Sequence, residues 1–564
     1  MQRENSVLAS LILAACMMMP GIVFAQTGEI TGTVSDSLSG DPIPGVNVVI
    51  AGTSQGAATS AEGAYTISGV EPGSYDLQAS FIGYETKLIE GVEVEAGEAT
   101  EVDIRLTESA VQLQEVVAVA YGTQERQAVT GSVANIDTEN LQAMPINSVD
   151  EALQGQIAGV SVQSASGIPG GGPAIQVRGT GNVGAGGQPL YVIDGYALPQ
   201  PGQGSVTRRN PLAEIPPSDI ESITVLKDAS ATAIYGSRAS NGVVVVQTKS
   251  GQAGSFNFNV SASTGWNTPW DRDVPEPANA QQFATFQNFI WSDRVAQGAA
   301  DEVPSEYRNP DQYGEGTNWW DAIMRTGRRH NVNVSARGGA QDIRSYFSVG
   351  LTQDEGLLRA HDFSRISARA NVDATIGERF DVGLRINPTF TERNLNWGGE
   401  GRGGPGGAPW MMCPLEPVRN EDGSLYTQPG KACTGVWSHP NPVHWLQAEV
   451  NEEQTLRTVG SAFVDYTLAE GLSIREQFNV DYRNSTTDFF VPSTIGGINS
   501  PPPSTPTGGL STGGYLNWLT ETTVNYSGEL GPGDIDALAG FTAQQQTEGN
   551  SGFSGIFPGD AIRT

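Results

Sequence analysis

From residue 253 onward the chain is dominated by segments in which apolar and polar residues alternate at every second position. Phe380–Phe390 and Leu472–Tyr482 show this most clearly, with charged residues such as Asp381 and Arg475 between the apolar ones. Successive side chains of a strand point to opposite faces of its sheet, so these segments are predicted to be strands with one apolar and one polar face. About nine strands of about ten residues are predicted, beginning near residues 256, 331, 343, 364, 380, 453, 472, 515 and 535. A helix is predicted near Ala278–Ala296.

This alternation fits two fold classes. A soluble sandwich turns its apolar faces inward. A transmembrane barrel turns them to lipid and lines a wet lumen with its polar faces. The strand pattern alone does not distinguish the soluble sandwich from the transmembrane barrel, so the choice depends on the other segments of the chain.

Residues 1–25 are predicted to be a signal peptide, because Arg3 precedes an apolar run from Val7 to Phe24 and Ala25 offers a cleavage site. A membrane-spanning helix is the first alternative, and Pro20 near the end of the run counts against it. Lipoprotein processing at Cys16 is the second. No later stretch supplies the roughly 20 apolar residues of a spanning helix, but an exported chain without such a helix can still cross a bilayer as a closed β-barrel.

Composition narrows the function classes. The 564 residues contain 62 acidic and 31 basic side chains, a formal net charge of −31. Nucleic-acid binding is excluded, because it needs a basic surface. The 70 glycines and 33 prolines indicate many turns and short strands.

Residues 26–107 are predicted to form a small β-sandwich, because short β-branched runs alternate with glycine-containing turns. The wording GDPIPGVNVVIAGTSQGAATSAEGAYTISGVEPGSYDLQASFIGYE resembles the carboxypeptidase-regulatory-like domain. An enzyme is not expected, because all four histidines lie beyond this region and none belongs to an H-x-x-E or H-E-x-x-H pair. The unit is interpreted as an accessory fold.

Residues 125–252 are predicted to form an α/β domain. A capping box at Ser148–Glu151 predicts a helix, and a second short helix is expected near Ala229–Tyr235. Strands are expected at Leu190–Ile193, Ile223–Leu226 and Val243–Thr248. The strings GPAIQVRGTGNVGAGGQPLYVIDG and DIESITVLKDASATAIYGSRASNGVVVVQTK resemble the plug domain of SusC/RagA-type TonB-linked (TonB-dependent) outer-membrane receptors.

Residues 108–124 form a linker containing LQEVVAVAYGTQ, an apolar run without proline that suits an extended strand. Both flanks are polar, so no complementary strand is expected nearby, and we interpret the run as a docking strand that completes another protein's sheet. A strand of a neighbouring domain is the alternative. The run resembles the TonB box, which implies that TonB binds Glu115, Val116, Val117, Ala118, Val119 and Ala120.

Two glycine-rich strings imitate catalytic motifs. Gly179–Gly184 fits G-x-G-x-x-G, but no helix is expected to begin there to bind a pyrophosphate. Gly509–Gly513 fits G-x-S-x-G, but it lies in a predicted proline/glycine loop and follows every histidine. No catalytic residue, cofactor or metal site is predicted.

The segment near residues 393–450 is too long for a periplasmic turn and is assigned to the outer face. Cys413 and Cys433, the two cysteines left after signal cleavage, are predicted to form a disulfide worth about 3 kcal/mol, with free thiols as the alternative. The same segment holds four tryptophans, Trp397, Trp410, Trp437 and Trp445. They are interpreted as packing within the loop or as part of an interfacial girdle, with a substrate loop that stacks on sugars as the alternative.

The expected fold is therefore a β-sandwich, an α/β plug domain and an incomplete transmembrane antiparallel β-barrel over residues 253–564. Plugged transporters close with about 22 strands, so the sequence is interpreted as a fragment. The resemblance implies an importer of oligosaccharides or peptides in the Gram-negative outer membrane, with TonB and a SusD-like surface lipoprotein as partners. A siderophore or cobalamin receptor is one alternative, and a surface adhesin is another.

Overall fold

The structure is a computed structural model. It describes residues 27–37, 40–51, 53, 55–81, 84, 86–107, 116–119, 122–125, 133–136, 153–163, 168–172, 174–179, 188–198, 212, 214–228, 232–269, 276–395, 407–427, 433–435, 440–495, 503–530 and 533–560. The chain divides into two compact units, residues 1–116 and 117–564.

The first unit is a two-sheet sandwich, as predicted. One sheet has the order β4–β1–β7, with β8 also paired to β1, and the other has the order β3–β2–β5–β6. Alternate residues of both sheets, among them Ile30, Val48 and Leu77, are buried in a common core. The strands are β1 Gly28–Asp36, β2 Asn47–Ile50, β3 Gly56–Ala58, β4 Ala64–Val70, β5 Gly73–Ser80, β6 Lys87–Val94, β7 Ala99–Glu101 and β8 Ile104–Leu106.

The second unit contains an α/β domain built on a five-stranded sheet of order β11–β16–β17–β14–β15. Its central strands are apolar on both faces because both are covered. The strands are β11 Val133–Ile136, β14 Leu190–Ile193, β15 Tyr196–Ala197, β16 Ile220–Leu226 and β17 Val243–Thr248, and β12 Val160–Gln163 pairs with β13 Ala174–Val177 in a separate ribbon. The three predicted strands are confirmed.

The two helices predicted for this domain agree less well with the structure than the strands do. The helix expected to begin at Ser148–Glu151 and to continue to about Gly159 is wrong for its described part: residues 153–159 are turns and a bend, and Val160 begins β12, although Leu153 and Ile157 are buried. Of the helix expected near Ala229–Tyr235, residues 229–231 lie outside the described residues, Thr232 is helical, and the last residues belong to the short 3-10 helix η2, Ala233–Ala239. A second 3-10 helix, η1 Pro217–Asp219, precedes β16.

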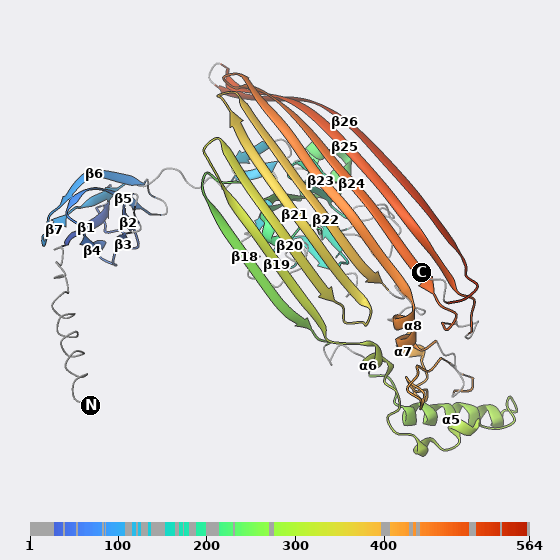
Figure 1. Cartoon of the computed structure of the whole chain (residues 1–564). Coiled ribbons are helices and arrows are strands. Elements are labelled where there is room, and N and C mark those ends of the chain that lie inside the picture. Colours follow the sequence, from blue (N-terminus) through green and yellow to red (C-terminus); the bar gives the residue numbers. More distant parts are fainter. Residues whose placement is uncertain are drawn as a thin grey trace, which may run out of the picture. The chain divides into compact units, whose positions relative to one another are not determined.

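The largest element is a curved antiparallel sheet in which every strand pairs with its neighbours in sequence (Figure 1). Its nine strands are β18 Gly254–Asn267, β19 Gly327–Gly339, β20 Ile343–Glu355, β21 His361–Ile376, β22 Phe380–Leu395, β23 Val450–Ala469, β24 Leu472–Val491, β25 Thr507–Leu530 and β26 Gly533–Ile556. All nine predicted strands are confirmed, but at 13 to 24 residues they are longer than predicted.

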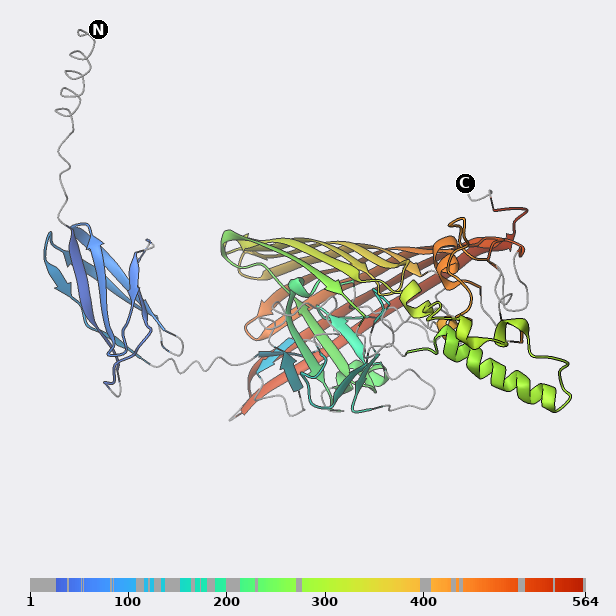
Figure 2. The ribbon, with the colours of Figure 1, turned by 90° about the horizontal axis from the view of Figure 1, so that it is seen from below.

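The two faces of this sheet reverse the pattern of a soluble protein. Apolar side chains such as Val349, Leu384 and Phe478 are exposed on the convex face, whereas Asn371 and Asn479 are fully buried on the concave face. The α/β domain lies against the concave face (Figure 2). A soluble sandwich would bury its apolar face, so that alternative is wrong.

The two ends of the sheet also differ. Short turns at residues 340–342, 377–379 and 470–471 join strands at one end, and the long connections 268–326 and 396–449 lie at the other (Figure 1). We call the described parts of these two connections the loop subdomain. It contains α5 Ala280–Ala296, α6 Trp319–Ile323, α7 Ala408–Met411, α8 Pro442–Ala448 and the 3-10 helices η3 Ser305–Tyr307 and η4 Pro310–Gln312. In the part of the chain that the structure describes, no helix combines the length and apolarity needed to cross a bilayer.

Candidate functional site

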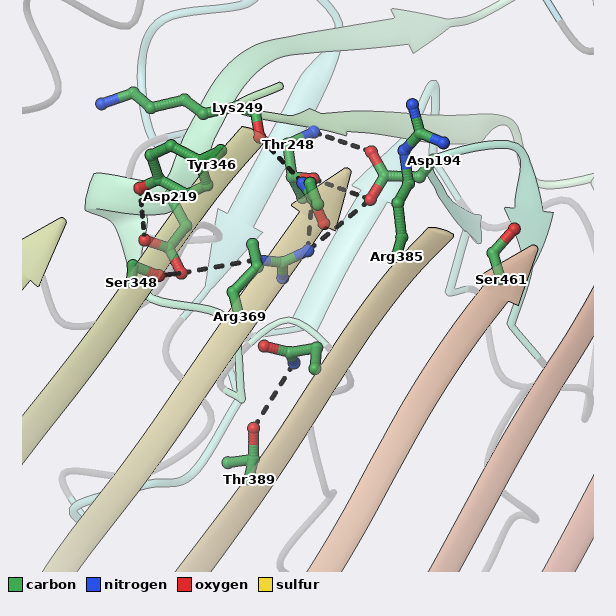
Figure 3. A network of polar contacts seen from close by, with 12 residues as sticks. Asp194, Asp219, Thr248, Lys249, Tyr346, Ser348, Arg369, Arg385, Thr389 and Ser461 are labelled. Atoms are coloured by element: carbon green, nitrogen blue, oxygen red, sulfur yellow. Dashed lines mark hydrogen bonds and ion pairs between the residues drawn. The ribbon is translucent and has the colours of Figure 1, made fainter. Parts of the chain in front are cut away.

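The contact between the α/β domain and the sheet centres on one arginine (Figure 3). Arg369 projects from β21, and its side chain is only 3% exposed. Its Nε lies 3.4 Å from Oδ2 of Asp219, and its Nη1 lies 3.6 Å from Oδ2 of Asp194. One buried cation of the sheet therefore joins two carboxylates of the domain, and leaving either side unpaired would be costly.

The two carboxylates are held in place from both sides. Asp219 ends η1 and accepts hydrogen bonds from the Tyr346 and Ser348 hydroxyls of β20, each 2.9 Å long. Asp194 follows β14 in a left-handed turn conformation, with φ of 48°. It accepts hydrogen bonds from the backbone N–H and the hydroxyl of Thr248, at 2.8 and 2.7 Å. Asp194 is therefore held from within its own domain, whereas Asp219 is held by hydroxyls of the sheet.

Two further arginines of the sheet reach acids of the same domain. Arg457 of β23 makes a bidentate ion pair with Asp481 of β24, both contacts 2.8 Å, and its third nitrogen lies 2.6 Å from Glu214. Arg337 of β19 lies 3.4 Å from Glu221. In all three cases the sheet supplies the guanidinium and the domain supplies the acid.

This contact is polar and only partly filled. A cavity between the domain and the sheet is lined by Tyr196, Glu214, Asn387 and the three arginines Arg369, Arg385 and Arg457. Among the described residues, the Asn387 side-chain oxygen and the Asn479 side-chain nitrogen are buried and have no hydrogen-bond partner. Burying a polar group without a partner costs free energy. Separating the two surfaces would expose these groups to water, which can form hydrogen bonds with them.

Lys249 borders the same network. Its backbone N–H donates to the Asp219 carbonyl over 2.8 Å. Burial lowers the pKa of its side-chain amine, against the opposing effect of the carboxylates of Glu221 and Asp219. Among the described residues, no group of three or more His, Cys, Asp or Glu side chains is arranged to hold a metal ion.

The apolar run before this domain is not isolated. β9 Val116–Val119 pairs with β10 Gly122–Glu125 in a two-stranded sheet. The expectation that no complementary strand lies nearby is therefore wrong, because the polar residues directly after the run fold back on it. Glu115 and Ala120 lie outside the described residues. A lone two-stranded ribbon is marginally stable, so it can open or accept a third strand.

The loop subdomain is held together by a bond between its two cysteines. Cys413 and Cys433 form a disulfide, with their Cα atoms 6.4 Å apart. The indole N–H of Trp319 donates to the Cys413 carbonyl over 3.0 Å, and the Tyr307 hydroxyl donates to the Thr434 carbonyl over 3.2 Å. Burial raises the pKa of Tyr307 above its usual range. The disulfide segment is therefore fixed to the connection that follows β18.

Two of the four tryptophans singled out from the sequence are described, and they differ in exposure. Trp410 on α7 is 51% exposed and meets the buried Trp320 edge-on, with ring centroids 5.7 Å apart. Trp445 on α8 is partly buried, and its indole N–H donates to Glu449. Trp397 and Trp437 lie outside the described residues.

The two glycine-rich segments that match catalytic motifs lie in different structural settings. Gly179 follows β13 with φ of 89°, and the rest of Gly179–Gly184 lies outside the described residues. Gly509–Gly513 belongs to β25, so the predicted proline/glycine loop is wrong there. Its backbone pairs with β24 and β26 on both sides, and these hydrogen bonds outweigh the weak strand preference of glycine.

The interface acids and arginines were not predicted as functional residues. A signal was present, because Asp194 and Asp219 directly adjoin buried strands, where a charge needs a partner. The partner could not be named, because Arg369 is 150 residues away from Asp219 along the chain.

Two family models match parts of this chain. The family model described as carboxypeptidase regulatory-like domain matches residues 29–107, and the TonB-dependent receptor plug domain matches residues 125–243. TonB-dependent receptor P26 of Formosa agariphila is 33% identical over 526 residues, covering 92% of this chain and 49% of that protein. TonB-dependent receptor SusC of Bacteroides thetaiotaomicron is 31% identical over 562 residues, covering 94% of this chain and 51% of that protein.

The fold of the chain is also similar to that of a solved structure. The RagAB peptide importer in its "open-open" state aligns with a TM-score of 0.63 at 27% identity, covering 80% of this chain and 51% of that chain. The chain thus spans about half the length of the curated relatives it matches.

Proposed function

The chain belongs to the SusC/RagA-type TonB-dependent receptors, and from this premise we propose that the protein imports an oligosaccharide or a peptide across the outer membrane. The observation that carries the proposal is the reversed sheet: its convex face is apolar, and its concave face is polar and blocked by the plug domain. Such a sheet suits a wall with lipid on one side and a wet lumen on the other.

The orientation follows from the two ends of the sheet. Outer-membrane barrels place short turns in the periplasm and long loops outside. We therefore assign the turns at 340–342, 377–379 and 470–471 to the periplasm and the loop subdomain to the cell surface.

We assign energy coupling to the β9–β10 ribbon. TonB would pair with Glu115–Ala120 as an added strand, with main-chain hydrogen bonds giving the affinity. A pull on this segment is transmitted to the plug, whose polar contacts with Arg337, Arg369 and Arg457 break in succession. Because the exposed groups are polar, water compensates much of the loss.

A SusD-like surface lipoprotein is the proposed partner at the cell surface. Phe286 and Phe289 lie three residues apart on one side of α5 and are 61% and 72% exposed. Exposed aromatic pairs of this kind mark protein interaction sites. Trp410 offers a further exposed aromatic surface, and we keep it as the candidate contact for a sugar ring or an aromatic peptide side chain.

Two alternatives can be separated from this proposal. A siderophore or cobalamin receptor would use the same plug and ribbon with a different solute. An adhesin would not need the ribbon at all. No catalytic role is proposed.

The test is deletion of Glu115–Ala120 in the complete protein. We expect uptake to be abolished while the solute still binds at the cell surface, because the loop subdomain is untouched. Growth of a knockout strain on a panel of glycans, peptides and iron complexes supplies the solute for this assay. Undiminished uptake by the deletion variant would refute the proposal, and adhesion without any uptake defect in the knockout would favour the adhesin.

A further inference from the structure

The plug touches the sheet at a second place, far from the arginine contacts. Residues 168–172 lie in the connection between β12 and β13, and Pro169 there is buried. Gly170 adopts a left-handed conformation with φ of 70°, and the ring of Phe363 from β21 occupies the space that a Cβ atom would need. We call residues 168–172 the plug tip; through Gly170 it packs closely against the ring of Phe363 at the start of β21.

The plug tip also touches the turn that precedes β21. A Cβ atom on Gly356 would lie 3.0 Å from Cδ of Pro169, so the glycine provides room for the proline. The Gly356 N–H donates to the carbonyl of the buried His361 over 2.7 Å, which closes the turn. Within it, Ala360 has φ of 60°, an unfavourable conformation for alanine that its surroundings must hold.

The opposite side of the same turn is bound to the loop subdomain. Arg325 donates from Nε to the Gly356 carbonyl over 3.1 Å, donates its backbone N–H to the Leu357 carbonyl over 2.8 Å, and forms an ion pair with Asp362. The Arg359 N–H donates to the carbonyl of Ile323, in α6, over 3.0 Å. The turn is therefore tied to the loop subdomain by backbone and side chain.

Apolar packing strengthens this side. Leu358 and Ala360 of the turn contact the small core that α6 and α8 share in the loop subdomain. Its buried members are Trp320, Ile323, Val443 and Leu446.

The plug tip is in turn continuous with the plug core. β12 and β13 pair in register from Val160 with Val177 to Gln163 with Ala174. Ile175 and Val177 of β13 are buried in one core with Ile223 of β16 and Val244 of β17. A displacement of this core therefore moves the tip that Phe363 and Gly356 contact.

We propose that the turn 356–361 is a joint that couples the plug to the loop subdomain. Displacement of the plug tip loosens α6 and α8, and an event at the cell surface that repositions α6 changes the hold on the plug tip, because coupling between two sites is reciprocal. The inference rests on the proposed function in one respect, namely that the plug moves during import. It deepens that function by naming the residues through which the cell surface and the plug sense each other.

The coupling between the plug and the loop subdomain can be measured by amide hydrogen exchange, without a solute. Asp219→Asn in the complete protein weakens the Arg369 contact and loosens the plug, which amide hydrogen exchange of β16 reports. In this background we expect exchange in residues 319–323 and 442–448 to accelerate by about fivefold or more, the lower end of typical coupling. Combining Asp219→Asn with Phe363→Ala should leave the change in β16 and abolish the change in the loop subdomain.

The matched control is Phe390→Ala, the same substitution on the exposed convex face of the sheet. It should leave the transmitted change intact. The joint is overturned if Phe363→Ala transmits as well as Phe390→Ala, or if β16 loosens with no response at 319–323 in the protein that retains Phe363. Binding of the purified periplasmic domain of TonB to the same variants tests the proposed function separately, since absence of binding alongside intact transmission would refute the function and keep the joint.

Discussion

The Arg369 contact supports a quantitative prediction about how firmly the plug is held. Arg369→Met keeps much of the side-chain volume and removes the charge. Asp219, 1% exposed, and Asp194, 12% exposed, would then lack their shared cation. Breaking a buried ion pair by removing one partner costs about 3–5 kcal/mol, because the other charge stays buried without compensation. We expect the opening free energy of the plug to fall by that amount.

Arg337→Met is the matched comparison. Arg337 also joins the sheet to the plug, but its partner Glu221 is 46% exposed. Water already solvates that carboxylate, so losing the pair should cost at most about 1 kcal/mol. The two variants remove the same group from the same sheet and differ in the burial of the acid.

Amide hydrogen exchange of β16 and β17 in the complete protein measures both effects. A loss of 3–5 kcal/mol corresponds to exchange about two to nearly four orders of magnitude faster. Adding Asp219→Asn to Arg369→Met should recover part of the loss, because one uncompensated charge disappears. Equal effects of Arg369→Met and Arg337→Met, or no recovery in the double variant, would refute the reasoning that the burial of the acids makes the Arg369 contact the stronger of the two.

Three further predictions concern other parts of the chain. Val117→Pro removes a backbone donor from β9 and should weaken binding of the TonB periplasmic domain by about tenfold or more, or about 1.4 kcal/mol; unchanged affinity in a calorimetric titration would exclude strand addition. Replacing Cys413 and Cys433 by serine should destabilise the loop subdomain by about 3 kcal/mol, seen as faster exchange in α6 and α8 that reductant reproduces in the unmodified protein. Burial, reinforced by the nearby Asp103 carboxylate, raises the pKa of Tyr65 to about 12. The isolated sandwich, which has its own core, should therefore keep the contribution of Tyr65 to its stability below about pH 10 and lose that contribution progressively as the pH rises towards 12. Tyr65→Phe should flatten this decline in thermal unfolding, and an unchanged decline would place the titrating group elsewhere.

Local sequence pattern was enough to identify the strands and their faces. Side-chain direction in a strand has a period of two, so the polar or apolar character of each position already states which face it occupies. The alternation in Phe380–Phe390 and Leu472–Tyr482 thus predicted β22 and β24. The buried runs Leu190–Ile193 and Val243–Thr248 likewise predicted β14 and β17.

Where pairing competes with local preference, the tertiary structure decided. Gly509–Gly513 has the composition of a loop, yet it is a strand because β24 and β26 supply hydrogen bonds on both sides. Strand length was underestimated for the same reason. The strand that pairs with β9 consists of polar residues, and their sequence pattern did not predict a strand.

The sequence by itself determined that this chain builds a sandwich, an α/β domain and a sheet with opposite faces, because those properties depend on residues close together in the chain. Only the tertiary structure decided that Arg369 meets Asp194 and Asp219, and that Phe363 rests on Gly170. The members of these pairs are far apart in sequence. Local sequence pattern does not predict which distant residue a side chain will contact once the chain has folded.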